Sequence, residues 1–259
     1  MNMGLGFSEI ALIAALVLLL FGPKELPYIF RNVARMFAKL KLYSDKIKRE
    51  LDEAIKLEEP QVPYENETQK KKNALRAQYR SILENQTAAE RQERSDAVWR
   101  ECIATQQYRD AKTVMIYISV GTEVETRLRI VEMLGIGKRV IVPFCKSTSY
   151  ELGMAEIKNF SEDVAEGTSI PEPVERIRDN FFKSDLQLVI CPAVAFDIYG
   201  SRLGRGKGCY DIFLKELKGR VPIFGFGFDC QIHQQNLPFD YHDVSMDQII
   251  TESGLLLTK

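Results

Sequence analysis

The sequence has few residues of the types that most often bind metals or form disulfides. It contains two histidines, His233 and His242, and neither has a second histidine or a cysteine at metal-ligand spacing, so each is expected to be structural or exposed. The five cysteines are scattered and include no C-x-x-C pair, which excludes a zinc knuckle and a disulfide scaffold and favours a reducing compartment. The formal net charge of -1 argues against nucleic acid as a partner.

The first 22 residues have almost no charge. Glu9 is the single charged side chain before Gly22, and an unbroken apolar run covers residues 10–21. A bilayer core of about 30 Å needs about 20 apolar residues in a helix, so residues 1–22 predict a short, marginally spanning transmembrane helix. The segment lacks the basic start and the small-x-small site of a cleaved signal peptide. Lys24 and the cations after it place the following residues in the cytoplasm.

A second helix is expected over residues 23–58. Gly22-Pro23 breaks the first helix, and Pro27 suits the first turn of the next one. Apolar residues then recur at spacings of three and four, with an excess of cations on the remaining surface. This pattern predicts an amphipathic helix on anionic lipid headgroups, although a stripe packed on the rest of the protein also fits. Residues 59–67, rich in proline and acids, predict a linker to a domain at 68–259.

These N-terminal features resemble TatB, a component of the twin-arginine protein translocase. They are the early acid Glu9, an FGP hinge at residues 21–23, Leu26-Pro27 and the long basic amphipathic helix, over about residues 1–58. TatA shares much of this pattern. The resemblance implies a single-pass chain in the inner (cytoplasmic) membrane, with TatC-like translocase subunits as partners. Glu9 is then either a polar residue inside the membrane or an interfacial side chain that reaches water.

The remaining residues alternate between helical and strand patterns. Residues 68–86 favour a helix, and Thr87 and Glu90 form the capping box of the next one. Short apolar runs rich in β-branched residues predict strands buried on both faces at 113–119, 139–143, 186–192 and 222–227. Further helices are expected at 123–134 and 210–217. This order predicts an α/β domain of three layers, a mostly parallel sheet with helices on both faces.

One loop, GSRLGRGKGCYD at residues 200–211, interleaves glycines with cations. It is neither a Walker A loop nor a dinucleotide fingerprint, because its glycines have the wrong spacing and Gly208 stands where the P-loop hydroxyl belongs. The glycines let successive backbone N–H groups face one anion, and the arginines and lysine add charge-assisted donors. The loop should meet residues 119–125 at the carboxyl edge of the sheet. We expect a polyphosphate site with Asp211 as a magnesium ligand; a solvated basic turn ending in a capping aspartate is the alternative.

Six motifs resemble, in order, those of the 5-formyltetrahydrofolate cyclo-ligase family. They are Lys72-x-x-x-Arg76, EVET at 123–126, GKRVIVP at 137–143, GTSIPEP at 167–173, AFDIYGSRLGRGKGCYD at 195–211 and DQIITE at 247–252. The resemblance covers about residues 68–253. It implies that ATP and magnesium are used to convert 5-formyltetrahydrofolate to 5,10-methenyltetrahydrofolate, with release of ADP and phosphate. Ring closure expels the formyl oxygen, which leaves more readily as phosphate than as hydroxide, so positioning and charge neutralisation suffice without a catalytic triad.

The resemblance also assigns roles to individual residues. Lys72 and Arg76 would hold the phosphates of ATP, with Lys70 and Lys71 as alternatives to Lys72. The nucleotide would also contact the loop residues Arg202, Leu203, Gly204, Arg205, Gly206, Lys207, Gly208, Cys209 and Tyr210. Arg205 and Lys207 would act in catalysis. The folate would face Arg205, Gly206, Lys207, Gly208 and Cys209.

Further residues would complete the folate and magnesium sites. Glu123 would hydrogen-bond the pterin beside a wall formed in part by Ile118, although a glutamate there can also simply begin a helix. Asp211 would bind magnesium with a second carboxylate, for which we expect Asp243 and Asp247 is the alternative. The family commonly has an aromatic residue at the position of Cys209, and loss of a stacking face there would weaken affinity by up to about tenfold.

Two functions follow from the sequence. The first is a membrane-tethered cyclo-ligase whose catalytic domain lies in the cytoplasm. The second is a translocase component whose appended domain is inert or regulatory. Both can hold in one polypeptide. A third possibility is that the join of the two parts reflects two adjacent genes read as one chain. The mass of the native polypeptide would decide this.

Overall fold

The structure, a computed structural model, describes residues 67–146, 151–165 and 170–257. The predicted membrane helix at 1–22, the predicted amphipathic helix at 23–58 and most of the predicted linker lie outside the described residues. Within the described ranges no helix is long and apolar enough to cross a membrane. Residues 65–259 form one compact unit. The first described residue of this unit, Glu67, begins a helix, whereas we predicted it as the last residue of the linker. An acid in the first turn favours that earlier start.

Two long helices begin this unit. The helix α3 (Glu67–Glu84) is followed after a short turn by α4 (Ala88–Ala104), and α5 (Gln106–Asp110) continues from it. The predicted capping box at the start of α4 is confirmed. Glu90 N donates to Thr87 Oγ1 at 3.2 Å, and Thr87 N donates to Glu90 Oε2 at 2.9 Å. These two bonds satisfy backbone and side-chain groups at the exposed helix start, which fixes where α4 begins.

A seven-stranded sheet forms the centre of the unit, in the order β12-β11-β9-β6-β1-β2-β3. The edge strands β12 (Gly254–Leu257) and β3 (Leu152–Ile157) pair antiparallel with their neighbours. The five central strands are parallel: β11 (Gln248–Thr251), β9 (Ile223–Phe226), β6 (Leu188–Pro192), β1 (Thr113–Ile116) and β2 (Arg139–Cys145). All four predicted strands are therefore present in an α/β fold with a mixed sheet, whereas the antiparallel edges were not predicted.

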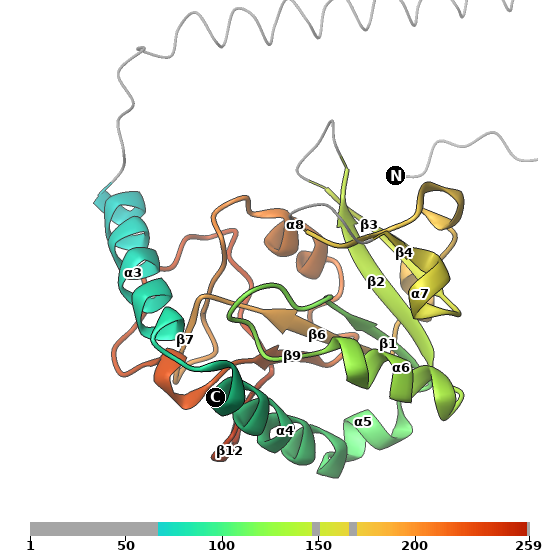
Figure 1. Cartoon of the computed structure of the whole chain (residues 1–259). Helices are drawn as coiled ribbons and strands as arrows, with labels where there is room; N and C mark the ends of the chain where they lie inside the picture. The colour runs from blue at the N-terminus through green and yellow to red at the C-terminus, as the bar shows by residue number, and fades with distance from the viewer. Residues whose placement is uncertain (1–66, 147–150, 166–169, 258–259) are drawn as a thin grey trace, which may run out of the picture. The chain divides into compact units, whose positions relative to one another are not determined.

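Both faces of the sheet are covered, as the near-continuous apolar strands predict (Figure 1). Val114 of β1 belongs to a core cluster with residues of α4, α5 and α6 (Arg127–Gly135). The next residue, Met115, belongs to a second cluster with Phe213 of α8 (Cys209–Lys215). Successive side chains of a strand point to opposite faces, so these two clusters lie on the two sides of the sheet. The predicted three-layer arrangement is thus observed in the described unit.

A smaller sheet holds the first helix close to the glycine-rich loop. Its strands are β10 (Ile232–His233), β7 (Ala195–Asp197) and β8 (Arg202–Leu203), in the order β10-β7-β8. Tyr79 of α3 packs in a third cluster with Leu203 of β8 and Leu237. Short elements complete the unit: α7 (Phe160–Asp163), β4 (Val164–Ala165), β5 (Glu172–Pro173), η1 (Glu175–Ile177), η2 (Lys183–Asp185) and η3 (Asp229–Gln231). Packing on the small sheet therefore positions α3 over the loop.

Candidate nucleotide and metal site

The glycine-rich loop has a conformation that requires its glycines. Gly206 and Gly208 have φ angles of 110° and 68°, where side chains are disfavoured. At Gly204, an added Cβ would lie 2.8 Å from Nη1 of Arg202, so that guanidinium would have to shift. The three glycines therefore shape the loop around neighbouring cationic side chains.

A buried carboxylate that we did not predict anchors the start of this loop. Asp197, at the end of β7, is fully buried and accepts the backbone N–H groups of Tyr199 and Ser201 at 2.9 and 2.8 Å. Its second oxygen accepts the N–H of Leu237 at 2.9 Å. One side chain thus ties the loop to the segment that leads into residues 240–244. No local sequence pattern points to this role, because the contact joins residues that lie 40 positions apart.

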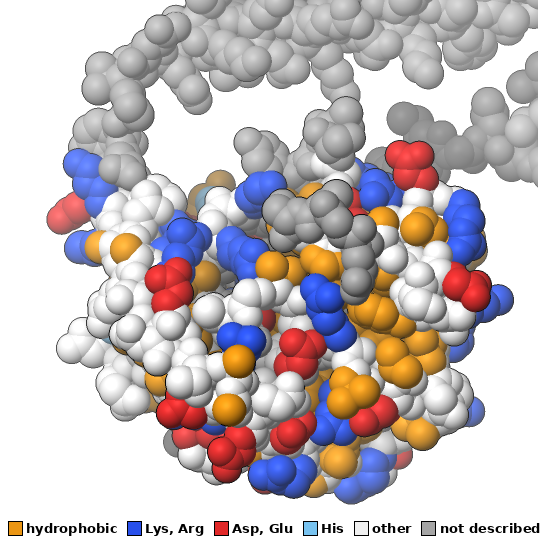
Figure 2. All heavy atoms as spheres, in the orientation of Figure 1, with side chains coloured by type: hydrophobic (Ala, Val, Ile, Leu, Met, Phe, Trp, Pro, Cys, Tyr) orange, Lys and Arg blue, Asp and Glu red, His pale blue; other side chains and the backbone are white. Residues whose placement is uncertain are grey.

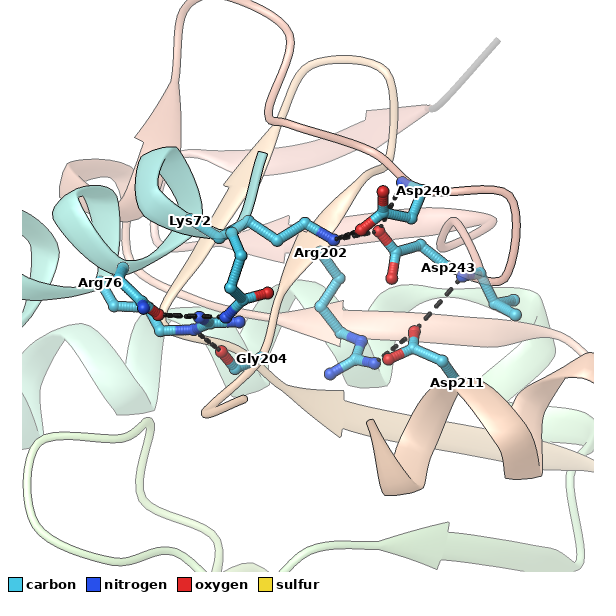
Figure 3. Close-up of polar contacts among 10 residues, drawn as sticks. Lys72, Arg76, Arg202, Gly204, Asp211, Asp240 and Asp243 are labelled. Carbon is cyan, nitrogen blue, oxygen red and sulfur yellow. Dashed lines mark hydrogen bonds and ion pairs between the residues drawn. The ribbon is translucent and has the colours of Figure 1, made fainter. Parts of the chain in front are cut away.

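Lys72 of α3 lies between two carboxylates (Figure 3). Its Nζ is 2.7 Å from Oδ2 of Asp240 and 2.6 Å from Oδ2 of Asp243, and its side chain is only 9% exposed. Burial acts to lower the pKa of the Lys72 ammonium, but its hydrogen bonds and charge interactions with the two aspartates outweigh burial and raise the pKa. Lys70 and Lys71 are exposed, so Lys72 is the one of these three lysines that reaches the site.

Arg76, one turn further along α3, lies against the glycine-rich loop. Its Nε donates to the carbonyl oxygen of Gly204 at 2.8 Å, and its Nη1 donates to Oδ1 of Asn73 at 2.6 Å. Burial is the main cause that lowers the pKa of Arg76, and the charge of Asp243 opposes that change. The two cations predicted to hold phosphates therefore reach the same site from one face of α3.

Asp211 lies in the first turn of α8, next to the segment that contains Asp243. Its Oδ1 accepts Nη2 of Arg202 at 2.7 Å and the N–H of Val244 at 3.3 Å (Figure 3). Because Val244 directly follows Asp243, the structure brings the two predicted magnesium ligands close together. The side chain of Arg202 is 3% exposed, and its Nε has no hydrogen-bond partner among the described residues. The side-chain partners of Asp211 show that it does not simply cap the turn.

The alternative magnesium ligand, Asp247, lies at the opposite end of the parallel strands, where they begin. It accepts Nζ of Lys218 at 2.6 Å and the N–H of Ile223, the first residue of β9, at 2.9 Å. These bonds place Asp247 at the amino end of a parallel strand, whereas Asp243 lies near the loops that follow the carboxyl ends. The geometry therefore favours Asp243 over Asp247.

A donor that our spacing criterion missed is His242. Asp240, His242 and Asp243 offer ligand atoms that all lie within 4.8 Å of one another. His242 has no histidine or cysteine partner, but Asp240 and Asp243 lie within two residues of it in the sequence. A D-x-H-D run in a loop is the signal that would have identified the group.

Glu123 and Arg205 join the loop after β1 to the glycine-rich loop. Nη2 of Arg205 is 2.7 Å from Oε1 of Glu123, and Oε2 of Glu123 accepts the N–H of Val120 at 3.0 Å. Burial raises the pKa of Glu123, and the charge of Arg205 only partly offsets that effect. The predicted helix at 123–134 begins instead at Arg127, so Glu123 is not a first-turn acid. The expectation that the two loops meet at one edge is confirmed.

The other predicted site residues differ in exposure. Arg205 and Lys207 are exposed, as are Gly206 and Gly208, and Tyr210 is half-buried beneath the guanidinium of Arg202. Three of the predicted contact residues have buried side chains, namely Ile118, Leu203 and Cys209. The thiol of Cys209 donates to the carbonyl oxygen of Lys207 at 3.7 Å. Lysine and arginine side chains gather on this face of the molecule between α3 and α8 (Figure 2).

Comparison with known proteins gives matches for both parts of the chain. The model of the 5-formyltetrahydrofolate cyclo-ligase family matches residues 68–252, and that of the mttA/Hcf106 family matches residues 3–50. A 5-formyltetrahydrofolate cyclo-ligase of Mus musculus is 31% identical over 193 residues, which are 71% of this chain and 94% of the relative. One of Escherichia coli (strain K12) is 33% identical over 147 residues, 55% of this chain and 79% of the relative.

Solved structures show the same fold. A 5,10-methenyltetrahydrofolate synthetase of Aquifex aeolicus has a TM-score of 0.62 at 28% identity, covering 73% of this chain and 93% of its own. A second synthetase, of Mycoplasma pneumoniae, has a TM-score of 0.56 at 23% identity, covering 70% and 98%, and supports the fold alone.

Proposed function

The chain belongs to the 5-formyltetrahydrofolate cyclo-ligase family, and from this premise we propose that it uses ATP and magnesium to convert 5-formyltetrahydrofolate to 5,10-methenyltetrahydrofolate. One observation carries the proposal. Cations of α3, the glycine-rich loop and the carboxylates of residues 211 and 243 meet in one site, through the contacts of Lys72 with Asp243 and of Arg76 with Gly204. Phosphoryl transfer needs this combination of positioned cations and carboxylates more than it needs a nucleophilic side chain.

The described residues fit the phosphates of ATP. Arg76 of α3 contacts the glycine-rich loop at Gly204, and Lys72 of the same helix contacts Asp243. The exposed Arg205 and Lys207 belong to the loop itself. The orphaned Nε of Arg202 is a buried donor that an anion could satisfy. When bound, ATP would supply the phosphoryl group that turns the formyl oxygen into a good leaving group.

The carboxylates fit magnesium, which prefers oxygen ligands and keeps several waters. Asp211 accepts the N–H of Val244, the residue directly after Asp243, and Asp243 accepts the N–H of Asp240. We assign Asp211 and Asp243 as the residues that would hold the ion against the phosphates.

The chain's own residues would orient the folate and neutralise charge. The side chain of Glu123 is 14% exposed beside the loop and would offer carboxylate oxygens to the N–H groups of a pterin. Arg205 is 50% exposed, so its guanidinium can leave Glu123 and approach the transferred phosphoryl group. Lys207 adds a second exposed cation on the same loop. The backbone of residues 205–209 would line the contact between folate and nucleotide.

The test is turnover by the full chain. We expect the methenyl product to form only when both ATP and magnesium are present, and its absorbance would measure the rate. Reversing the charges of Arg205 and Lys207 together should abolish turnover, because the two acidic side chains would then repel phosphate. The matched control reverses Arg100 and Lys112, which are exposed outside the site. Turnover that survives the loop reversal, or its absence in the folded wild-type chain, would contradict the proposal.

The match of residues 3–50 to the mttA/Hcf106 family supports a second proposal, that the N-terminal segment tethers the chain to the cytoplasmic membrane. The enzyme would then act on the cytoplasmic side, and the segment would contact TatC-like translocase subunits. We expect the full chain to stay with membranes after alkaline carbonate extraction. The full chain carrying Asp243→Asn should restore twin-arginine export in a strain that lacks TatB. Extraction into the soluble fraction contradicts the tether, and membrane insertion without restored export contradicts the translocase role.

A further inference from the structure

The ammonium of Lys72 lies between Asp240 and Asp243, which together with His242 offer ligand atoms for a metal ion. Its ammonium is 2.6 Å from one carboxylate and 2.7 Å from the other, and it comes from a helix 171 and 168 residues away in the sequence. We propose that Lys72 is a stand-in cation that keeps metal ions out of this site until the phosphates of a nucleotide draw the lysine away. This inference deepens the proposed function and rests on it for the identity of the phosphate ligand.

The space between the carboxylates holds one cation at a time. Magnesium binds carboxylate oxygens at about 2.0–2.1 Å, which is closer than the ammonium approaches them. An ion bound to both Asp240 and Asp243 would therefore contact Nζ of Lys72 directly, and the two positive charges would repel each other. Metal entry between Asp240 and Asp243 therefore requires Lys72 to move.

The charges of the cluster favour replacement of the Lys72 ammonium by a divalent ion. Asp240 and Asp243 carry two negative charges and Lys72 carries one positive charge, so these three side chains together keep one net negative charge. A divalent ion would neutralise both carboxylates and release the lysine. Without phosphate, the released ammonium would lose two charge-assisted hydrogen bonds. With phosphate, it gains new acceptors, and Arg76 already points to the loop that would hold them.

The donor set also supports a latent cation site. His242 adds a nitrogen within 4.8 Å of the two carboxylate oxygens, and it is exposed, so ions in solution can reach the cluster. The ion pair of Lys218 with Asp247, where the parallel strands begin, lacks this set of metal-ligand donors. There Lys218 faces one side-chain carboxylate, Asp247, whose other oxygen is already used by a backbone N–H.

The experiment measures metal binding without nucleotide and without turnover. Mn²⁺ would be titrated into the full chain and the free ion followed by electron paramagnetic resonance. We expect Lys72→Met to bind Mn²⁺ at least about tenfold more tightly than the wild-type chain, because removing the ammonium uncovers the carboxylates. Lys72→Arg keeps the positive charge, and Lys71→Met removes an exposed lysine next to it, so neither should gain affinity.

Two further measurements keep the result interpretable. Lys72→Gln should show the same gain, which covers a folding defect of the methionine variant. Adding Asp243→Asn to Lys72→Met should remove the gain, because the site loses a carboxylate. Unchanged Mn²⁺ affinity in both folded Lys72 variants, or an equal gain in Lys71→Met, would overturn the proposal.

A non-hydrolysable ATP analogue separates this inference from the proposed function. In the wild-type chain, the analogue should increase Mn²⁺ affinity, whereas in Lys72→Met the ion should bind tightly before the analogue is added. If the wild-type chain binds no analogue but Lys72→Met still gains Mn²⁺ affinity, the stand-in role of Lys72 is supported and the nucleotide assignment fails. Strong Mn²⁺ binding by the wild-type chain alone would contradict the stand-in role.

Discussion

Asp243 and Asp247 lie four residues apart and pair with lysines at the same distance, yet their surroundings differ. Each has a lysine Nζ at 2.6 Å. The lysine of Asp243 is 9% exposed and comes from 171 residues away, whereas that of Asp247 is 36% exposed and lies 29 residues away. Asp247 fixes the start of β9, and Asp243 faces the carboxyl-edge loops. Sequence spacing alone could not distinguish a structural ion pair from a site in which a buried cation faces excess negative charge.

Matched substitutions of the two aspartates test most directly whether Asp243 serves the reaction and Asp247 does not. Asp243→Asn should reduce kcat/KM by about 100-fold or more, because a carboxylate that would hold magnesium against the phosphates is lost. Steady-state assays of product formation at saturating magnesium would measure this. Asp247→Asn is the control, and a comparable loss of kcat/KM in that variant would reverse our assignment of the two residues.

Substitution of the cations sharpens the same comparison. Arg76→Ala should raise KM for ATP by about 10- to 100-fold, because charge-assisted hydrogen bonds contribute about 1.5–3 kcal/mol. Lys218→Ala removes a lysine of the amino edge and should leave KM for ATP unchanged. Initial rates at varied ATP would test both variants. Equal KM values for Arg76→Ala and the wild-type chain would exclude Arg76 from the nucleotide site.

Much of the fold was predictable because it depends on local pattern. Apolar runs such as 139–143 identified the buried strands, and Thr87 with Glu90 fixed the start of α4. The antiparallel edge strands β3 and β12 were missed, because edge pairing depends on tertiary contacts more than on composition. The start of α6 was misplaced because loop hydrogen bonds, such as that of Glu123 with Val120, compete with the helix.

The candidate site was predictable where one segment carries it. The motif at 200–211 and the Lys72-x-x-x-Arg76 spacing identified residues that the structure brings together. The pairing of Lys72 with Asp240 and the anchoring by Asp197 join segments far apart in the chain, and no local pattern encodes them. The inward orientation of Cys209 likewise depends on packing.

A smaller effect tests the structural role of the amino edge. Asp247→Ala should reduce the free energy of unfolding by about 1–3 kcal/mol, because the N–H of Ile223 loses its side-chain acceptor and Lys218 loses its partner. Thermal unfolding at fixed protein concentration would measure this change. Unaltered stability together with lost turnover would show that Asp247 serves the reaction instead.

The smallest expected effect concerns pH. Burial raises the pKa of Glu123, so its carboxylate becomes protonated at a higher pH than an ordinary glutamate. If Glu123 must be ionised to accept a pterin N–H, kcat/KM should fall as pH decreases through that raised pKa. Glu123→Gln should lower kcat/KM by about tenfold and remove this acid limb, because the amide does not titrate. An identical acid limb in the variant would assign it to another group.

The central claim is that α3, the glycine-rich loop and residues 240–244 form one nucleotide and metal site. Calorimetric titration of the full chain with a non-hydrolysable ATP analogue and magnesium tests it most directly. The account predicts one analogue bound per chain, with affinity weakened by at least about tenfold in Asp243→Asn and unchanged in Asp247→Asn. No binding by the folded wild-type chain, or equal weakening in the two variants, would contradict it.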